Sequence, residues 1–279
     1  RGEMTLHPRS FTRPSLSYTF RHNDLDVYHE GGRIHSFIYN QHRCALTPIN
    51  FNLRNFNLQA GLYWDYLHFL DNTLTTGSHP INLENDHYFN FHVQLNYNSE
   101  NQWYFPTHGS RLKVEYAYIT DNFTQLDDKA GLSEVNANWR FSIPLSKRFT
   151  LRPMVYGRCL WGAKIPVIYG NSIGGEWFGH YLEQQMPFAG IGNMEFTDRH
   201  FMALQLEAQQ SIASSHFILL RLAAAQHAEE FKHTFKQQTL LGYQLGYYYN
   251  TLLGPLGATI GYSNKTKEVN FYINLGFEF

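Results

Sequence analysis

The sequence has little charge, and neither sign is in clear excess. Only 16% of its 279 residues are charged, and the formal net charge is -1, whereas a soluble domain usually carries about 25% charged residues. The mean hydropathy of -0.40 shows that apolar residues have not replaced the missing charge. Without a surplus of Lys and Arg there is no basic field to attract nucleic acid, so we exclude a nucleic-acid partner.

Long hydrophobic runs and a cysteine framework are also missing. The richest apolar stretch, residues 212–225, is interrupted by His216 and Arg221. It is too short for a helix to cross about 30 Å of hydrocarbon. No signal-peptide pattern opens the chain, so we expect that an export signal has been removed or that the chain is a fragment. Cys44 and Cys159 match no metal-binding spacing, and we interpret both as small apolar residues.

Histidine is plentiful, but its spacing defines no reactive site. The 15 His are scattered, and no HExxH motif occurs. No GxSxG nucleophile elbow is present, and Ser215 and His216 fall at an expected tight turn. We therefore predict no catalytic residue, no cofactor and no metal. One enzymatic alternative stays open, because an outer-membrane phospholipase can also be a twelve-stranded barrel with its Ser and His on the lipid-facing wall.

The chain is rich in aromatic residues and in strict alternation. It contains 19 Tyr, 22 Phe and 5 Trp. In residues 269–279 every second residue is apolar, and the same alternation runs through residues 89–98 and 134–143. A period of two is the period of a β-strand whose two faces differ. These segments therefore predict strands that separate two unlike environments.

The composition of the two faces indicates lipid on one side and confined water on the other. The polar face holds Asn, Gln, Gly and Ser rather than the Lys and Glu of a surface in bulk water. The apolar face carries Tyr and Trp near strand ends, as in the aromatic girdles of membrane barrels. Strands in lipid must pair on both edges and so close on themselves. We predict an all-β, transmembrane, antiparallel up-and-down β-barrel.

The assignment of faces makes an expectation for individual residues. The residues expected to face lipid are Val93, Leu95, Val135, Ala137, Ile273 and Leu275. The residues expected to face the lumen are Gln94, Asn136 and Asn274.

We predict about twelve strands, with both termini at the periplasmic end. An even count is expected of a bacterial single-chain barrel. The strands are expected at residues 12–22, 33–42, 54–68, 86–98, 109–120, 132–144, 148–162, 200–212, 216–228, 238–250, 254–264 and 268–279. The long, polar connections are 69–85, 121–131, 163–199 and 229–237. The linker 43–53 is long for a periplasmic turn, and its residues 44–49 could extend a strand.

Three segments and the C-terminal end resemble the bacterial surface-antigen superfamily of outer-membrane barrels, which includes the BamA and TamA types. Residues 104–112, Tyr-Phe-Pro-Thr-His-Gly-Ser-Arg-Leu, are similar to its FPT-x-G-x-R-L turn. Residues 251–256 resemble the turn before its penultimate strand, and the chain ends like its assembly signal, on Phe277 and Phe279. Residues 171–190 resemble the long loop of the patatin-associated branch. The resemblance covers about residues 12–279.

The resemblance implies a barrel without the other modules of the family. Family barrels commonly have sixteen strands behind periplasmic POTRA modules, and patatin-type members add a lipase domain. Neither module is in this chain, so we expect residues 1–279 to form a single outer-membrane domain. Whether that domain is a complete twelve-stranded barrel or part of a sixteen-stranded one is left open.

The resemblance also implies that the loop 163–199 folds into the lumen as a plug. In BamA-type barrels the equivalent loop offers an Arg-Gly pair to acidic lumen residues, and this pair is absent here. We expect residues 171–190 inside the barrel, with Glu176 or Glu183 near an arginine of the wall. The plug candidates are Gly174, Gly175, Glu176, Pro187, Phe188 and Gly190. The lumen candidates are Arg140, Arg152, Arg158, Glu207 and Arg221, beside Glu134.

The predicted function is that of a membrane module for protein or lipid handling or assembly, with its substrate unassigned. A passive or gated pore is the alternative, because the lumen charges could form either a structural network or a gate. The expected partners are outer-membrane lipids and the barrel-assembly machinery during biogenesis. A homo-dimer or larger membrane assembly is left open.

Overall fold

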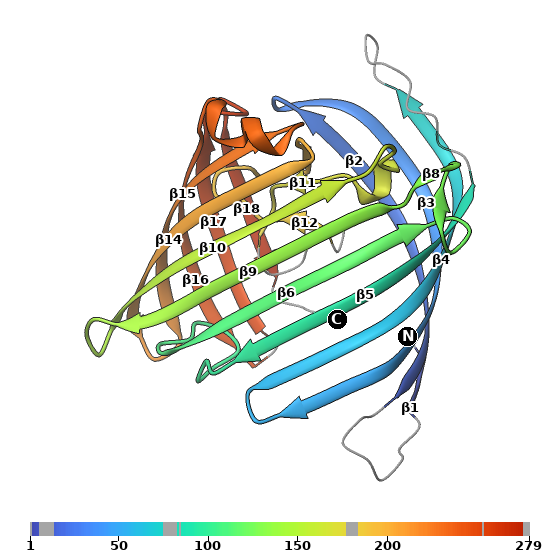
Figure 1. Cartoon of the computed structure of the whole chain (residues 1–279). Coiled ribbons are helices and arrows are strands. Elements are labelled where there is room, and N and C mark those ends of the chain that lie inside the picture. Colours follow the sequence, from blue (N-terminus) through green and yellow to red (C-terminus); the bar gives the residue numbers. More distant parts are fainter. Residues whose placement is uncertain are drawn as a thin grey trace.

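The computed structural model describes residues 2–5, 14–74, 83, 85–176, 184–252 and 254–275. Twelve long antiparallel strands follow one another in chain order around one curled sheet (Figure 1). They are β2 (Ser15–His29), β3 (Gly32–Leu53), β4 (Phe56–Leu74), β5 (Asp86–Asn98), β6 (Gly109–Thr120), β9 (Leu132–Pro144), β10 (Phe149–Trp161), β14 (His200–Ala213), β15 (His216–Ala228), β16 (Leu240–Thr251), β17 (Gly254–Ser263) and β18 (Val269–Leu275). The predicted all-β, up-and-down wall is confirmed.

Short elements complete the described chain. They are β1 (Gly2–Thr5), the hairpin β7 (Gln125–Leu126) and β8 (Lys129–Ala130), the 3-10 helices η1 (Val167–Tyr169) and η2 (Phe231–Lys236), and β11 (Ser172–Ile173), β12 (Gln185–Met186) and β13 (Glu195–Phe196) of the loop between β10 and β14. Figure 1 shows β11 and β12 inside the curl of the sheet. None of the helices in the described ranges is long and apolar enough to span a membrane.

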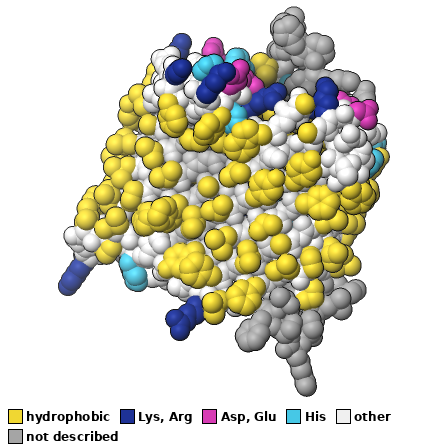
Figure 2. All heavy atoms as spheres, in the orientation of Figure 1, with side chains coloured by type: hydrophobic (Ala, Val, Ile, Leu, Met, Phe, Trp, Pro, Cys, Tyr) yellow, Lys and Arg dark blue, Asp and Glu magenta, His cyan; other side chains and the backbone are white. Residues whose placement is uncertain are grey.

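The outward face of the wall is apolar, as predicted. Val93, Val135 and Ile273 are 47%, 36% and 61% exposed, and Leu95 and Ala137 lie half-exposed on the same alternation. The side chain of Leu275 lies outside the described residues. Figure 2 shows apolar side chains spread over this wall, with charged side chains gathered along the rim at the loop end. We call the part of the wall that carries this apolar outward face the membrane band. It comprises β9, β10, β14–β18 and the halves of β2–β6 that lie away from the loop end.

The first hairpin does not follow the predicted boundaries. The sequence predicted a loop at 23–32 and a linker at 43–53, but β2 continues to His29, Glu30 and Gly31 form a two-residue turn, and β3 continues to Leu53. The alternation persists in this hairpin with its polarity reversed, and a register shift between Leu46 and Ile49 interrupts the pattern further along β3. Likewise β4 continues to Leu74, into the predicted loop 69–85.

We call residues 22–40 the hairpin extension. Its inward side chains include Leu25 and Val27, which are 4% and 0% exposed, while Asp24 and Asp26 point outward. The inward residues belong to an apolar cluster that also contains Ile168 and Met194 of the loop between β10 and β14. The hairpin extension is therefore built like part of a water-soluble domain.

The two edges of the sheet approach each other at the loop end. Among the described residues no ladder pairing joins β2 to β18. The turn between β2 and β3 lies against the loop before β18, since a Cβ on Gly31 would lie 3.4 Å from the Glu268 carboxylate. The carboxylate of Glu195, on β13, accepts hydrogen bonds from the backbone N–H groups of Glu30 and Gly31 at 3.0 and 2.8 Å. The loop between β10 and β14 thus reaches the first edge strand.

Candidate functional site: the lumen and its plug

A row of alternating charges crosses the inner wall. Arg152 pairs in register with Glu207, Glu207 with Arg221, and Arg221 with Gln244, so that the four side chains share one face of β10, β14, β15 and β16. The Nε of Arg221 donates to Glu207 at 2.6 Å, and Arg152 donates to the other oxygen of the same carboxylate. Glu207 and Arg221 are buried. Because the signs alternate, each charge is compensated by a neighbour.

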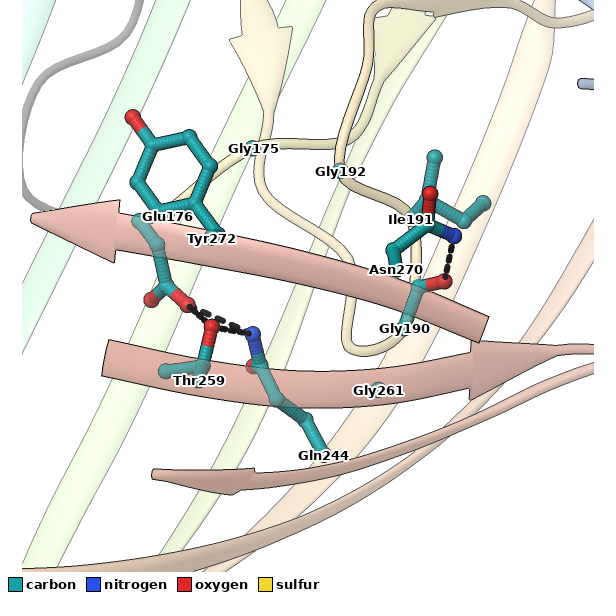
Figure 3. A pocket seen from close by; sticks show the side chains of 10 residues that line it. All are labelled: Gly175, Glu176, Gly190, Ile191, Gly192, Gln244, Thr259, Gly261, Asn270 and Tyr272. Carbon is teal, nitrogen blue, oxygen red and sulfur yellow. Dashed lines mark hydrogen bonds between the residues drawn. The ribbon is translucent and has the colours of Figure 1, made fainter. Parts of the chain in front are cut away.

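The loop between β10 and β14 adds a carboxylate to this row. Arg221 donates to one oxygen of Glu176 at 2.5 Å. Gln244 and Thr259 donate to the other oxygen at 2.5 and 3.2 Å (Figure 3). Glu176 is only 2% exposed. Side chains from three wall strands, β15, β16 and β17, therefore hold one plug carboxylate. Glu183, the other candidate, lies outside the described residues.

The charge arrangement is the reverse of the one that the sequence resemblance implies. There the loop offers an arginine to acidic residues of the lumen. Here the loop offers Glu176, and the wall supplies the guanidinium of Arg221. A carboxylate with a guanidinium makes the same strong, charge-assisted hydrogen bonds whichever side carries each partner. The loop is thus anchored through a carboxylate and not through the Arg-Gly pair that the resemblance implies.

A second pair of charges holds the base of the loop. Arg158, which is 1% exposed, makes two hydrogen bonds to Glu134 of 2.6 and 2.5 Å. Its remaining nitrogen donates to Oδ1 of Asn171 at 2.8 Å and to the carbonyl of Tyr169 at 2.9 Å. The amide of Asn171 donates in turn to the carbonyl of Asp198 at 2.8 Å. The start and the end of the loop are therefore tied together on the wall.

The loop also reaches the far side of the lumen. The hydroxyl of Tyr169 donates to Asp65, which is fully buried on β4, at 3.1 Å. Asp65 also accepts two hydrogen bonds from Arg43 of 2.7 and 2.8 Å. The contacts among Arg43, Asp65 and Tyr169 were not expected from the sequence, because Arg43 was placed in a linker. The same period of two, continued from residues 35–41 to residue 43, before the register shift between Leu46 and Ile49, would have placed Arg43 on the inward face.

Glycines let the plug backbone lie directly on the wall. A Cβ on Gly242 would lie 1.9 Å from the carbonyl oxygen of Ala189, and a Cβ on Gly261 would lie 2.7 Å from the Cα of Gly190. Gly190 itself has φ +81°, and a Cβ there would lie 2.1 Å from the carbonyl oxygen of Tyr262. Polar side chains, glycines and Ile191 line a partly open cavity of 10 Å³ beside Glu176 (Figure 3), about the space of one water.

The remaining plug candidates shape and bury the loop. Gly174 and Gly175 have φ +115° and +75°, a region that favours glycine. Phe188 is 1% exposed in an apolar cluster with wall residues. The carbonyl of Pro187 accepts a hydrogen bond from the hydroxyl of Tyr156 at 2.8 Å. The structure thus places all six plug candidates inside the curl of the sheet.

The turn at the opposite end, residues 99–108, also enters the lumen. Phe105 is 1% exposed and stacks on Phe217, with 4.2 Å between ring centroids. Arg140 binds Glu100 of the same turn through hydrogen bonds of 2.8 and 2.6 Å. The FPT-x-G-x-R-L resemblance falls on this turn, but the burial of its phenylalanine inside the barrel was not predicted.

A continuous chain of polar contacts joins the turn to the plug. The amide of Gln209 donates to the carbonyl of Phe105 at 3.2 Å and accepts from Arg152 at 3.4 Å. The chain runs in order through the Phe105 carbonyl, Gln209, Arg152, Glu207, Arg221 and Glu176. Two loops from opposite ends of the wall therefore share one charge network. Of the lumen candidates, Arg152, Glu207 and Arg221 belong to this chain of contacts. Arg140 binds Glu100 of the turn, and Arg158 and Glu134 hold the base of the loop. Phe277 and Phe279 lie outside the described residues.

Outside the lumen, a rim contact tightens the end of the loop. The ring of His227 lies 2.9 Å from the carboxylate of Asp198, and this hydrogen bond lowers the pKa of Asp198. His216 lies 2.7 Å from the hydroxyl of Tyr247. Within the described ranges, no three His, Cys, Asp or Glu side chains are grouped so that they could hold a metal ion.

The curled antiparallel sheet, its apolar outer face and its charged, filled interior define a β-barrel of the outer membrane. The OMP85 superfamily model matches residues 48–279, and the chain belongs to this superfamily. A comparison with curated proteins finds no match.

Two solved structures share the fold. BamA from Haemophilus ducreyi lacking POTRA domains 1–3 is 14% identical with a TM-score of 0.72, and the match covers 99% of this chain and 61% of that one. CdiB from Escherichia coli is 16% identical with a TM-score of 0.59, and the match covers 98% of this chain and 50% of that one. The present chain thus spans about half to three fifths of these relatives. The patatin-associated branch is not confirmed by these comparisons.

Proposed function

We propose that this chain is a plugged membrane module for the handling or assembly of protein or lipid at the outer membrane. The observation that carries the proposal is the position of Glu176, which is buried and bound by Arg221, Gln244 and Thr259. An unpaired buried carboxylate costs several kcal/mol. Withdrawal of the loop would leave Arg221 with one carboxylate fewer, so the lumen favours the plugged state.

The filled lumen supports this module over a passive pore. The loop between β10 and β14 occupies the lumen from one end, and Phe105 closes on Phe217 from the other. Both segments bind the same charge network, so a continuous aqueous path would require both to move. A twelve-stranded wall filled by such a loop leaves little room for a channel. We expect little steady current through such a barrel.

We also propose an orientation in the membrane, with both termini on the periplasmic side. β2 begins and β18 ends at the end of the wall that carries the short turns 54–55, 145–148 and 214–215. Short turns are typical of the periplasmic side, so both termini belong there, and residues 1–279 act as one outer-membrane domain. The partners are outer-membrane lipids and, during biogenesis, the barrel-assembly machinery. Superfamily membership supports assembly or secretion of protein as the role of a larger system.

Single-channel recording in planar bilayers tests the plugged state. The parent chain should show little steady current, and deletion of residues 174–188 should raise conductance and lower thermal stability. Glu176→Gln keeps the side-chain shape and removes its charge, so it should increase the frequency of openings without removing the loop. Glu115→Gln is the matched control, because Glu115 pairs with Lys113 at 3.0 Å on β6, outside the plug contacts. A parent chain that conducts steadily, as strongly as the deletion variant, would support the pore instead.

A further inference from the structure

The loop between β15 and β16 presents aromatic side chains at the rim of the barrel. Its 3-10 helix η2 carries Phe231 and Phe235, which are 48% and 71% exposed. Thr234, between them, is fully buried, and η2 packs against β14 and β15. The helix is therefore seated on the wall through one side. Its two phenylalanines, four residues apart, are left largely uncovered by the protein.

Phe231 continues the aromatic surface of the membrane band. Its ring centroid lies 6.4 Å from that of Trp161 and 5.5 Å from that of His200. Trp161 ends β10 on the outward, lipid-facing side and is 43% exposed. Membrane proteins place aromatic residues at the boundary between hydrocarbon and headgroups. The exposed rings of η2 therefore adjoin a surface that already contacts lipid.

The charges around η2 largely neutralise one another. Lys232 pairs with Glu230 at 2.7 Å, and Arg199 pairs with Glu229 at 2.9 Å. His233 lies 3.8 Å from Glu230, and Lys236 ends the helix. A surface whose charges are mostly paired has little net field to select a charged partner. Apolar contact through the phenylalanines is what this surface offers.

We propose that η2 is an interfacial anchor, with Phe231 and Phe235 inserted into the lipid interface beside the barrel at its loop end. The partner is the lipid surface itself. Exposed phenylalanine side chains that adjoin such a band can lie in the boundary between headgroups and acyl chains, where their apolar area is buried. The proposal depends on the barrel being in the membrane and not on the plug, so the two can fail separately.

Spin labelling offers a direct test, because the chain has only two cysteines. In a Cys44→Ala, Cys159→Ala background, a nitroxide is attached at Phe235→Cys, and the protein is reconstituted into phospholipid bilayers. Lys129→Cys, on the exposed hairpin β7–β8 at the same end of the wall, is the matched control. Circular dichroism and heat-modifiable migration on gels confirm that both variants are folded.

The expected result is a reversal of probe access between the two sites. At position 235 collisions with lipid-soluble oxygen should exceed those with a water-soluble nickel chelate several-fold, and at position 129 the chelate should dominate. A label at 235 that meets the chelate as readily as the control would overturn the anchor. A label at 235 shielded from both probes would also overturn it and would indicate a protein partner on this surface.

Discussion

The hairpin extension and the membrane band alternate with the same period and the opposite polarity. In the hairpin extension Leu25 and Val27 point inward and Asp24 points outward. In the membrane band Glu207 and Arg221 point inward, while Leu206 is 40% exposed on the outside. A period of two therefore identifies a strand but leaves open which of its faces is inside. Which face is inside depends on the surroundings, which are lipid for the membrane band and water for the hairpin extension.

The plug connects these two regions. Ile168 and Met194, near its ends, pack into the apolar cluster beneath the hairpin extension. Glu176 and Gly190, in its middle, contact the charged row and the glycines of the band. Apolar burial is favourable against water, whereas in the band lipid already satisfies the apolar residues and the polar ones turn inward. The loop therefore packs apolar side chains under the hairpin extension near its ends and offers a carboxylate to the charged row in its middle.

The largest effect should come from the interior of the band. Glu207→Ala leaves Arg152 and Arg221 without their shared carboxylate and should lower the free energy of unfolding by about 3–5 kcal/mol. Asp24→Ala, on the outer face of the hairpin extension, removes the same charge from an exposed site and should change it by no more than about 0.5 kcal/mol. Denaturant titration in lipid vesicles measures both. Equal costs would contradict the assignment of Glu207 to a buried network.

An arginine scan of the outer face should give the next largest effect. Val93→Arg places a charge toward lipid and should cost about 2–4 kcal/mol near the midplane, and Val135 and Ile273 should behave alike. Gln94→Arg points into the lumen and should cost less. His22→Arg, on the outer face of the hairpin extension, should be close to neutral. If the same titration gave equal penalties at Gln94, Asn136 and Asn274, the assignment of faces would fail.

The sequence was most informative where apolar and polar residues alternate along a whole segment. From residue 86 onward, alternation predicted the strands of the wall to within about two residues, except where the last strand enters the undescribed end. It failed in the first hairpin, because the polarity of the faces reverses between lipid and water. The inward position of the wall arginines followed from register, whereas that of the loop with Glu176 was implied by the resemblance to the superfamily.

The partner of each group inside the lumen could not be read from the sequence. Asp65 and Tyr169 are 104 positions apart, and their contact depends on the curvature of the whole sheet. Register assigns a side chain to a face but does not say which residue meets it across the lumen. The entry of Phe105 into the barrel is of the same kind, because its turn resembles an ordinary connection between strands.

The smallest effect concerns a charge pair at the rim, where water weakens ion pairs relative to those buried in the lumen. The hydrogen bond from His227 lowers the pKa of Asp198, whose side chain is 34% exposed. A carboxylate with a lowered pKa in the folded state stabilises the fold above its unfolded pKa of about 3.9, and this stability is lost as the pH falls through the folded value. Asp198→Asn should therefore cost no more than about 1 kcal/mol near neutral pH, and the difference from the parent should vanish as the solution is acidified below that range. Thermal midpoints of parent and variant, recorded in lipid vesicles across the acid range, would show the two curves converging. A gap that stays constant with pH would mean that packing, and not the charge of Asp198, closes this end of the loop.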